Sequence, residues 1–261
     1  MRPPDNIVDR RRLLQLMAGG AVMAAGLTPA AAKEARIAKL IGEARALPTV
    51  SERIGLISRA LVGTRYRGHT LIGGPWRPEK FVVRDDAFDC VTFCETVLAA
   101  AVARDADGFA PALRAIRYRN GVVSWRARNH YFFEWSRCNV ENGFCRAVEF
   151  DAMVDLDKSV YWHRALGRRR FAMRAVPSDT FLAGRDRLKT GDIVGFVTRR
   201  PNLDYFHTGF VAFGPRGEFL LRHASQSHGR VVDESMARFV AANRVRYVTL
   251  LRPRDSETIA V

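Results

Sequence analysis

The segment from 48 to 63, "PTVSERIGLISRALVG", repeats its apolar residues with the period of an α-helix. The residues on this apolar face are Ile54, Ile57 and Leu61. Thr49 and Glu52 have the spacing of a capping box, and Gly63 is a typical helix stop. The pattern therefore predicts a short amphipathic helix with one face on a core.

A second, more apolar helix is predicted over 87–102, "AFDCVTFCETVLAAAV". Its apolar stripe is formed by Cys90, Phe93, Val97, Leu98, Ala101 and Val102. Asp89 is suited to be the N-cap, which makes Cys90 the first helical residue. A third helix is predicted over 108–121, ended by an Asn-Gly pair, whereas 128–138, "RNHYFFEWSRC", fits a helix or a strand.

Beyond about Leu188 the pattern changes to the period of two that is typical of strands. Four strands are predicted, at 191–198, 205–214, 217–225 and 245–253, with a short helix at 234–243 before the last of them. The glycine-rich segment 63–81 is read as a loop. Helices followed by an antiparallel sheet indicate an α+β fold in a single domain, 33–253, with a loose tail at 254–261.

Residues 1–32 have the layout of an export signal: a basic start, an apolar run from Leu13 to Leu27, and a small-residue stretch ending at Ala32. The apolar run is too short to span a bilayer. Arg10 and Arg11 favour the twin-arginine version, with an ordinary export signal or an uncleaved anchor as alternatives. We expect the mature protein to work outside the cytoplasm, in the periplasm or an equivalent exported location.

The formal net charge of +15 predicts attraction to an anionic polymer or surface. Only "GRRRF", 167–171, approaches the basic and aromatic pattern of nucleic-acid binders, and it is read as a solvated basic face. Nucleic acid is therefore not an expected partner.

The chain has four cysteines, and in an exported protein these suggest a disulfide. Cys138 and Cys145 bracket the turn signal Asn142-Gly143. A four-residue turn would bring the two thiols opposite each other, whereas a two-residue turn would leave them diagonal, so the bridge stays open. The cysteine spacings do not match the paired C-x-x-C pattern of a zinc site, and no metal is expected.

Cys90 is the candidate nucleophile. At a helix N-terminus the unpaired backbone N–H groups and the helix dipole favour a thiolate. The same amides, from Val91 onward, could stabilise an oxyanion when the sulfur attacks a carbonyl. The alternative is that Cys90 is a small apolar residue that begins a core helix.

Thiol chemistry needs a proton acceptor, usually histidine, and strand periodicity selects two of the six histidines. His207 lies on the apolar face at the start of its strand, and His223 ends the next strand. The hairpin between these strands could place the two rings side by side, one as base and the other orienting it. Each alone would be read as a core histidine. Cys90 Sγ and a ring nitrogen of His207 are expected within about 4 Å.

The motifs "DCVTF", "GDIVGF", "HTGFV" and "RHAS", in this order, resemble the NlpC-type papain-fold hydrolases of bacterial peptidoglycan. The segments "LVGTRYRGHTLIG", "FDCVTFCE", "RNHYFFEW" and "LLRP" resemble the amidase-like branch, an N-acetylmuramoyl-L-alanine amidase group. The resemblance spans roughly Ile54 to Pro253. It departs from the common D-C-S-G motif at Val91 and Thr92, and no separate wall-binding module is visible.

The resemblance implies a papain-like fold in which Cys90 is the nucleophile, His207 the general acid/base and His223 the orienting residue. The residues it implies at the substrate or oxyanion site are Tyr66, Asp89, Val91, His130 and Tyr131. For Tyr66, packing of a loop aromatic on the core is the alternative.

The implied activity is amide hydrolysis in peptidoglycan or muropeptides, without a cofactor and without stable membrane insertion after signal cleavage. The bond favoured is the one cut by an N-acetylmuramoyl-L-alanine amidase. A D-glutamyl-diaminopimelate endopeptidase and a catalytically silent wall-binding protein are the alternatives.

Overall fold

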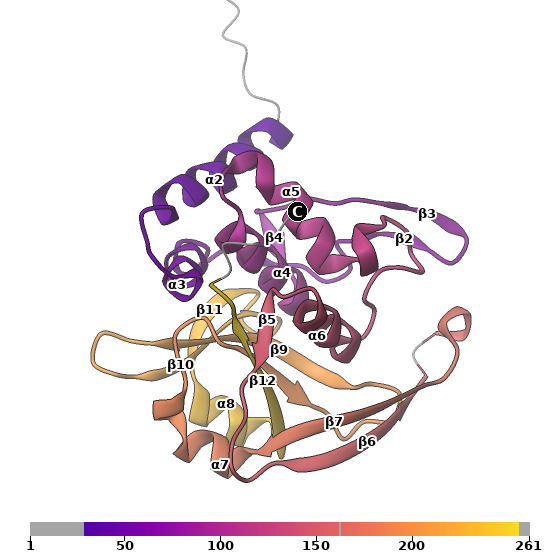
Figure 1. Ribbon diagram of the computed structural model, residues 1–261, viewed down its shortest axis with the longest axis vertical. Helices are drawn as coiled ribbons and strands as arrows, with labels where there is room; N and C mark the ends of the chain where they lie inside the picture. Colours follow the sequence, from indigo (N-terminus) through magenta and orange to yellow (C-terminus); the bar gives the residue numbers. More distant parts are fainter. Residues whose placement is uncertain (1–28, 162, 256–261) are drawn as a thin grey trace, which may run out of the picture.

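The computed structural model describes residues 29–161 and 163–255, which form one mixed α+β domain with a large curled sheet (Figure 1). Five helices gather on one side of the sheet in this view. Residues 1–28 of the predicted export signal, and most of the predicted tail, lie outside the described residues. Within the described part, no helix combines the length and apolar character needed to cross a membrane.

The helices above the sheet are α2 (Pro29–Ala44), α3 (Val50–Ala60), α4 (Cys90–Val102), α5 (Ala106–Arg117) and α6 (Phe132–Glu141). The predicted capping box of Thr49 and Glu52 begins α3, and Asp89 caps α4 by accepting from the backbone N–H of Thr92. The segment that fitted a helix or a strand equally is α6. Helix α2 was not predicted, and the expected cleavage point after Ala32 falls inside it.

The main sheet has ten strands in the order β4-β1-β11-β10-β9-β8-β12-β7-β6, with β5 beside β12. The four predicted strands are confirmed as β8 (Ile193–Val197), β9 (Tyr205–Phe213), β10 (Phe219–Ser225) and β12 (Tyr247–Pro253). The strands not predicted are β1 (Arg65–Tyr66), β4 (Ala87–Phe88), β5 (Cys145–Ala147), β6 (Val154–Val160), β7 (Arg169–Pro177) and β11 (Arg230–Ser235).

The expected separation of N-terminal helices from a purely antiparallel C-terminal sheet needs correction. The segment read as a loop contributes β1, and it also forms a small separate hairpin, β2 (Ile72–Gly74) and β3 (Arg77–Lys80). Strand β1 joins the sheet edge beside β11 and pairs in parallel with β4. Pairing with a distant strand stabilises these two-residue strands, and a local pattern of alternation is too short to reveal them.

All four cysteines are free in the structure. Cys138 lies in α6, and Gly143, at φ 79°, follows the end of that helix instead of forming a hairpin turn. The turn signal at Asn142-Gly143 therefore serves a helix C-terminus, which is the other common use of a glycine with positive φ.

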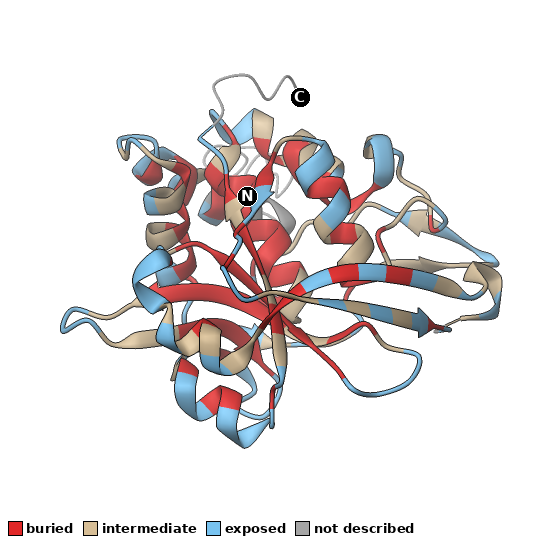
Figure 2. Cartoon of the chain, turned by 60° about the horizontal axis from the view of Figure 1, so that its bottom comes forward, coloured by how far each residue is buried: buried red, intermediate tan, exposed pale blue. Residues whose placement is uncertain are grey.

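The sheet is covered on both faces. Phe210 of β9 packs its ring 5.6 Å from that of Phe93 in α4, whereas the next residue, Val211, belongs to a second core with Phe239 of α8 (Met236–Ala242). Successive side chains of a strand point to opposite faces, so α4 and α8 lie on opposite sides of the sheet. In the outer strands, β6 alternates half-buried and exposed residues, and the middle of β7 alternates exposed and buried ones, as Figure 2 shows.

The remaining elements are short: α7 (Ser178–Ala183) and three 3-10 helices, at Arg119–Gly121, Arg164–Leu166 and Arg185–Arg187. Helix α7 packs beside α8, β7 and β12.

A buried ion pair holds α4 to α5. Arg117 Nε lies 2.8 Å from Glu95 Oε2, and the two side chains are 2% and 3% exposed. Arg117 also donates to the backbone carbonyl of Val82. Burial raises the pKa of Glu95, and the Arg117 guanidinium opposes that shift. The arginine therefore compensates a carboxylate that would otherwise be buried alone.

We expect Arg117→Ala to lower the free energy of unfolding by about 3 to 5 kcal/mol, because it leaves the carboxylate of Glu95 buried without its partner. Lys39→Ala, which breaks the exposed pair with Glu43, should cost less than about 1 kcal/mol. Urea unfolding followed by circular dichroism measures both. Equal losses in the two variants would contradict this role for the buried pair.

Candidate active site

Cys90 begins α4 at the point where the helix meets the sheet. The Asp89 carboxylate accepts from the backbone N–H of Thr92 at 2.8 Å, and the Thr92 hydroxyl accepts from the backbone N–H of Asp89 at 2.9 Å. This reciprocal cap fixes the first turn of the helix. One turn further on, Cys94 Sγ lies 3.9 Å from the hydroxyl of Thr208 in β9. The first turn of α4 is therefore seated against the strand that carries His207.

Cys90 lies against β9, where the backbone N–H of Thr208 hydrogen-bonds to its thiol. The pairing of β9 with β10 runs to Phe210 and Arg222. The next residue of β9, Gly209, is in close contact with β10, because an added Cβ would come 2.8 Å from the Cβ of His223. Cys90 is thus placed beside the backbone of the residue that follows His207.

His207 and His223 lie on neighbouring strands, on the face that α8 covers. Their rings stand almost at right angles, at 88°, and His207 Nε2 lies 2.6 Å from His223 Nδ1. On its other side, His223 Nε2 lies 3.2 Å from Oε2 of Glu234 in β11. The phenyl ring of Phe239 packs against both imidazoles, with centroid distances of 5.3 and 5.4 Å.

This chain of hydrogen bonds fixes the tautomers of both rings. An ionised carboxylate only accepts, so Glu234 takes the N–H of His223 Nε2. His223 Nδ1 is then an acceptor, and it takes the N–H of His207 Nε2. His207 Nδ1 is left with a free lone pair, which makes it the basic atom of the pair.

Sequence reasoning found both histidines and missed Glu234, because that residue was assigned to the helix at 234–243. It belongs to β11, Arg230–Ser235, which has no regular alternation of buried and exposed residues and is defined by its pairing with β10. The register of β10 with β11 places His223 opposite Val232 and Leu221 opposite Glu234, so this carboxylate is two residues along the neighbouring strand from the position opposite His223.

The site rests with both groups neutral. Burial, and then the Asp89 carboxylate, raise the pKa of Cys90 to about 12, against the backbone N–H groups of Thr208 and Val91. Burial, and then His223, lower the pKa of His207 to about 3. The sequence predicted a thiolate at this helix N-terminus, but in the structure burial outweighs the helix amides. In the described part of the chain, no hydrogen bond joins the Cys90 thiol to the His207 ring.

Tyr66 and Val91 lie near the thiol. Burial raises the pKa of Tyr66, followed by the charges of Cys90 and Asp89, which places its hydroxyl within electrostatic reach of both. The backbone N–H of Val91 hydrogen-bonds to the Cys90 thiol. The Tyr66 hydroxyl therefore lies near the sulfur from β1, and the Val91 backbone N–H lies near it from α4.

His130 and Tyr131 lie elsewhere, before α6. His130 Nε2 lies 2.6 Å from the backbone carbonyl of Trp125 and its ring packs against that indole at a tilt of 55°, while burial lowers its pKa to about 4. Tyr131 is buried and packs its ring on Phe171 at 5.2 Å. Neither is among the residues that line the cavity beside His207.

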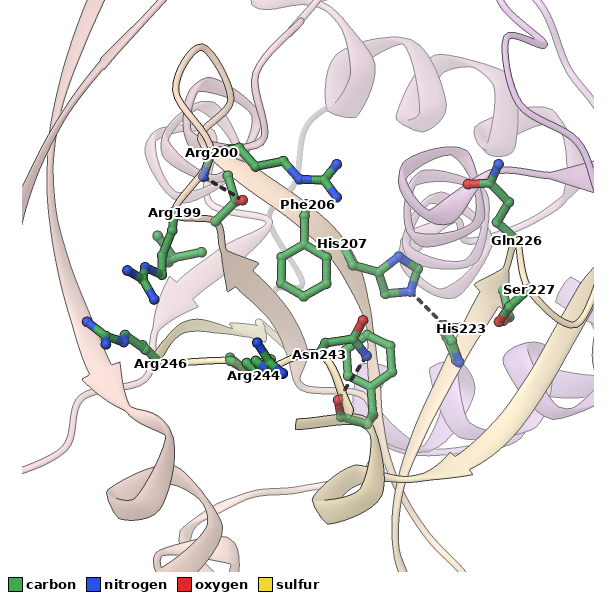
Figure 3. Close-up of a pocket in the computed structure, with 15 residues that line it drawn as sticks. Arg199, Arg200, Phe206, His207, His223, Gln226, Ser227, Asn243, Arg244 and Arg246 are labelled. Carbon is green, nitrogen blue, oxygen red and sulfur yellow. Dashed lines mark hydrogen bonds between the residues drawn. The ribbon is translucent and has the colours of Figure 1, made fainter. Parts of the chain in front are cut away.

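A cavity of about 730 Å³ opens beside the histidine pair (Figure 3). Its lining residues are Val197, Thr198, Arg199, Arg200, Phe206, His207, His223, Ser225, Gln226, Ser227, Phe239, Asn243, Arg244, Val245 and Arg246. Cys90 is not among them. The described residues contain no group of three or more His, Cys, Asp or Glu side chains that could hold a metal ion.

Comparisons with known proteins agree with this architecture. The AmiA-like family model, described as N-acetylmuramoyl-L-alanine amidase-like, matches residues 56–246. No match is found among the curated proteins.

Several solved structures share the fold. A Legionella pneumophila protein of the DUF1460 family is 21% identical, with a TM-score of 0.74, over 84% of this chain and 94% of that one. An N-acetylmuramoyl-L-alanine amidase from Bacteroides uniformis is 22% identical, with a TM-score of 0.65, over 79% and 99%. A Bacteroides fragilis protein described as a proposed xylanase is 25% identical, with a TM-score of 0.64, over 75% and 98%.

The raised pKa of the Cys90 thiol predicts slow alkylation. At pH 8.5, where an ordinary thiol is about half ionised, we expect iodoacetamide to modify Cys90 about 100-fold more slowly than free cysteine. Asp89→Asn should speed the reaction, because it removes the carboxylate that raises the thiol pKa and keeps a capping side chain. Peptide mass mapping follows the modified residue.

Asp105→Asn, the same change at the N-cap of α5, is the matched control and should leave the rate unchanged. Alkylation of Cys90 at neutral pH as fast as a free thiol would instead show a thiolate paired with protonated His207.

Proposed function

The chain belongs to the N-acetylmuramoyl-L-alanine amidase-like family, and we propose that it is an exported cysteine hydrolase of peptidoglycan with the NlpC-type papain-like fold. The bond we assign is the amide between the lactyl carbonyl of muramic acid and the alanine amine of the stem peptide. The observation that carries the proposal is the Glu234–His223–His207 hydrogen-bond chain beside a helix-terminal cysteine. A nucleophile, a base and a group that orients the base are the parts that acyl transfer requires.

In the first step Cys90 Sγ attacks the amide carbonyl while its proton passes to His207 Nδ1. The His207 imidazole is unprotonated at neutral pH and can take this proton, but its lowered pKa makes it a weak base, so the transfer depends on the Glu234 charge, relayed through His223, to stabilise the imidazolium. The step needs Sγ and Nδ1 to come within hydrogen-bond reach, and such contacts tighten when substrate binds. The carbonyl oxygen takes the negative charge of the tetrahedral intermediate.

The amides at the start of α4 are suited to hold that charge. The backbone N–H groups of Cys90 and Val91 already face the sulfur, and the Tyr66 hydroxyl is a further donor within electrostatic reach. Asp89 acts through the cap that fixes this turn. We keep His130 and Tyr131 as candidates for contacts with more distant parts of the substrate.

In the second step the C–N bond breaks, and His207 returns the proton to the leaving amine. The acyl group is then held as a thioester on Cys90. Water adds to the thioester carbonyl, with His207 Nδ1 taking its proton, and the carboxylic acid and the free thiol are released. The imidazolium that forms twice in this cycle is stabilised by the Glu234 charge, relayed through His223.

Other functions are less well supported by the site. A D-glutamyl-diaminopimelate endopeptidase would use the same residues on another bond. A binding protein without catalysis would not need the ordered Glu234–His223–His207 chain. A glycosidase needs a pair of carboxyl groups facing the sugar, and none of the described residues that line the cavity is Asp or Glu.

Mass spectrometry of muropeptides tests the bond and the nucleophile together. We expect the protein to release free stem peptide from the sugar, and Cys90→Ala to abolish the release while keeping the fold. Cys138→Ala, at a free cysteine in α6, is the matched control and should remain active. Cleavage inside the peptide would replace the proposed bond, and full activity of Cys90→Ala would overturn the mechanism.

The hydrogen-bond chain predicts a positioning role for Glu234. Glu234→Leu should lower kcat about 10-fold to 100-fold with little change in KM, because the tautomer of His207 is no longer fixed. Glu234→Gln should retain more activity, since its amide oxygen can still accept from His223. Steady-state kinetics on a purified muropeptide measures both variants.

The control is Glu218→Leu, which removes a carboxylate from the turn between β9 and β10, where it pairs with Arg216. It should leave kcat unchanged. If Glu234→Leu keeps kcat within about twofold of the unmodified protein, the Glu234–His223–His207 hydrogen-bond chain does not position His207 for catalysis.

A further inference from the structure

The cavity beside His207 is strongly basic. Arg199 and Arg200 come from the loop between β8 and β9, and Arg244 and Arg246 from the connection between α8 and β12. Figure 3 shows these arginines on one side of His207, with Gln226 and Ser227 on the other. Among the described residues that line the cavity there is no carboxylate to balance them.

These guanidinium groups have no partner within the described part of the chain. None of the four guanidinium groups takes part in an ion pair or a hydrogen bond there, and only the backbone N–H of Arg200 donates to the hydroxyl of Thr198. Two other arginines are paired instead: Arg222 makes two contacts to Asp233, at 2.7 and 2.8 Å, and Arg252 does the same with Asp192. The arginines of the cavity are therefore available to an external anion.

The backbone at Arg244 supports a role for its side chain. Arg244 follows the C-cap Asn243 of α8 and has a φ of 49°, in the left-handed region. Glycine is the usual residue at such a position after a helix, because a side chain there is strained. A residue with a strained backbone that points an arginine at a cavity is a candidate for binding.

We propose that this cavity is the subsite for the leaving half of the substrate and that it selects a peptide with at least two free carboxylates. The inference rests on the proposed function, in which His207 protonates the leaving amine. The amine therefore leaves beside His207, which lines the cavity, while the acyl half stays on Cys90, which does not line it. The four arginines then contact the peptide that is attached to the leaving amine.

The chemistry of the stem peptide fits four guanidinium groups. An arginine can hold a carboxylate through two parallel N–H donors, and a lysine cannot. The peptide released by the amidase carries the free α-carboxylate of D-glutamate and the carboxylates of diaminopimelate. The alternative endopeptidase cut would release a diaminopimelate unit, which is also a dicarboxylate.

Two muropeptides test the inference, one with free D-glutamate and diaminopimelate carboxylates and one with these carboxylates amidated. We expect kcat/KM to be at least about 10-fold higher for the acidic muropeptide and to fall with added salt. Equal cleavage of the two would overturn the inference.

The double variant Arg244→Gln/Arg246→Gln should raise KM for the acidic muropeptide about 10-fold, with kcat within about twofold, and should abolish the preference between the two substrates. Arg170→Gln removes an exposed arginine of β7 that does not line the cavity, so it is the matched control and should change neither value. If the double variant folds and keeps the preference for the acidic muropeptide, the cavity does not recognise the carboxylates.

Direct binding separates this inference from the proposed activity. Calorimetry on Cys90→Ala uses the tripeptide L-alanyl-γ-D-glutamyl-diaminopimelate and its amidated form as probes. Tighter binding of the acidic tripeptide, lost in the arginine double variant, supports the subsite even if no muropeptide is cleaved. Absence of that binding, or displacement by a single-stranded oligonucleotide that binds more tightly, overturns it.

Discussion

The burial of helix α4 is the constraint on which the rest of the site depends. From Thr92 to Ala101 every residue of this helix is buried, between the N-terminal helices on one side and β9 and β10 on the other. A helix so enclosed cannot slide or rotate without opening the core, and the edge contact of Phe93 with Phe210 fixes its register on the sheet. The position of Cys90 follows from this arrangement, because Cys90 is the residue at which the helix emerges from the core. The Asp89 cap then fixes the orientation of the backbone amides in the first turn.

The close approach of β9 and β10 at Gly209 gives this helix end its surroundings. A Cβ at Gly209 would come within 2.8 Å of the Cβ of His223, so a residue without a side chain lets the two strands approach this closely. The imidazoles of His207 and His223 meet beside this contact, with 2.6 Å between Nε2 and Nδ1, and the next residue of β9, Thr208, offers its backbone N–H to the Cys90 thiol. The start of β9 thus brings together groups from α4, β9 and β10.

Burial decides the protonation of these groups. Desolvation disfavours every charged form, so the thiol pKa rises and the imidazole pKa falls, and the helix amides do not reverse the first shift. Both shifts favour the neutral forms of the thiol and the imidazole. Positive charge lies at the cavity that the histidines line, where the exposed arginines are solvated and cost little to keep.

The sequence by itself determined the elements with strong local signals: the capping box that begins α3, the Asp89 N-cap and apolar stripe of α4, and the strands β8, β9, β10 and β12. Each depends on interactions within a few residues, so the pattern of apolar and polar positions is sufficient. It also singled out Cys90, His207 and His223, because a helix start and two adjacent strands limit where such side chains can point. Only the tertiary structure decided the rest. The short strands β1 and β4 exist through pairing with distant partners, and Glu234 reaches His223 through the register of β11. The neutral thiol arises from desolvation, and the arginine-lined cavity arises because segments far apart in the chain converge. Neither effect can be seen in a local pattern of residues.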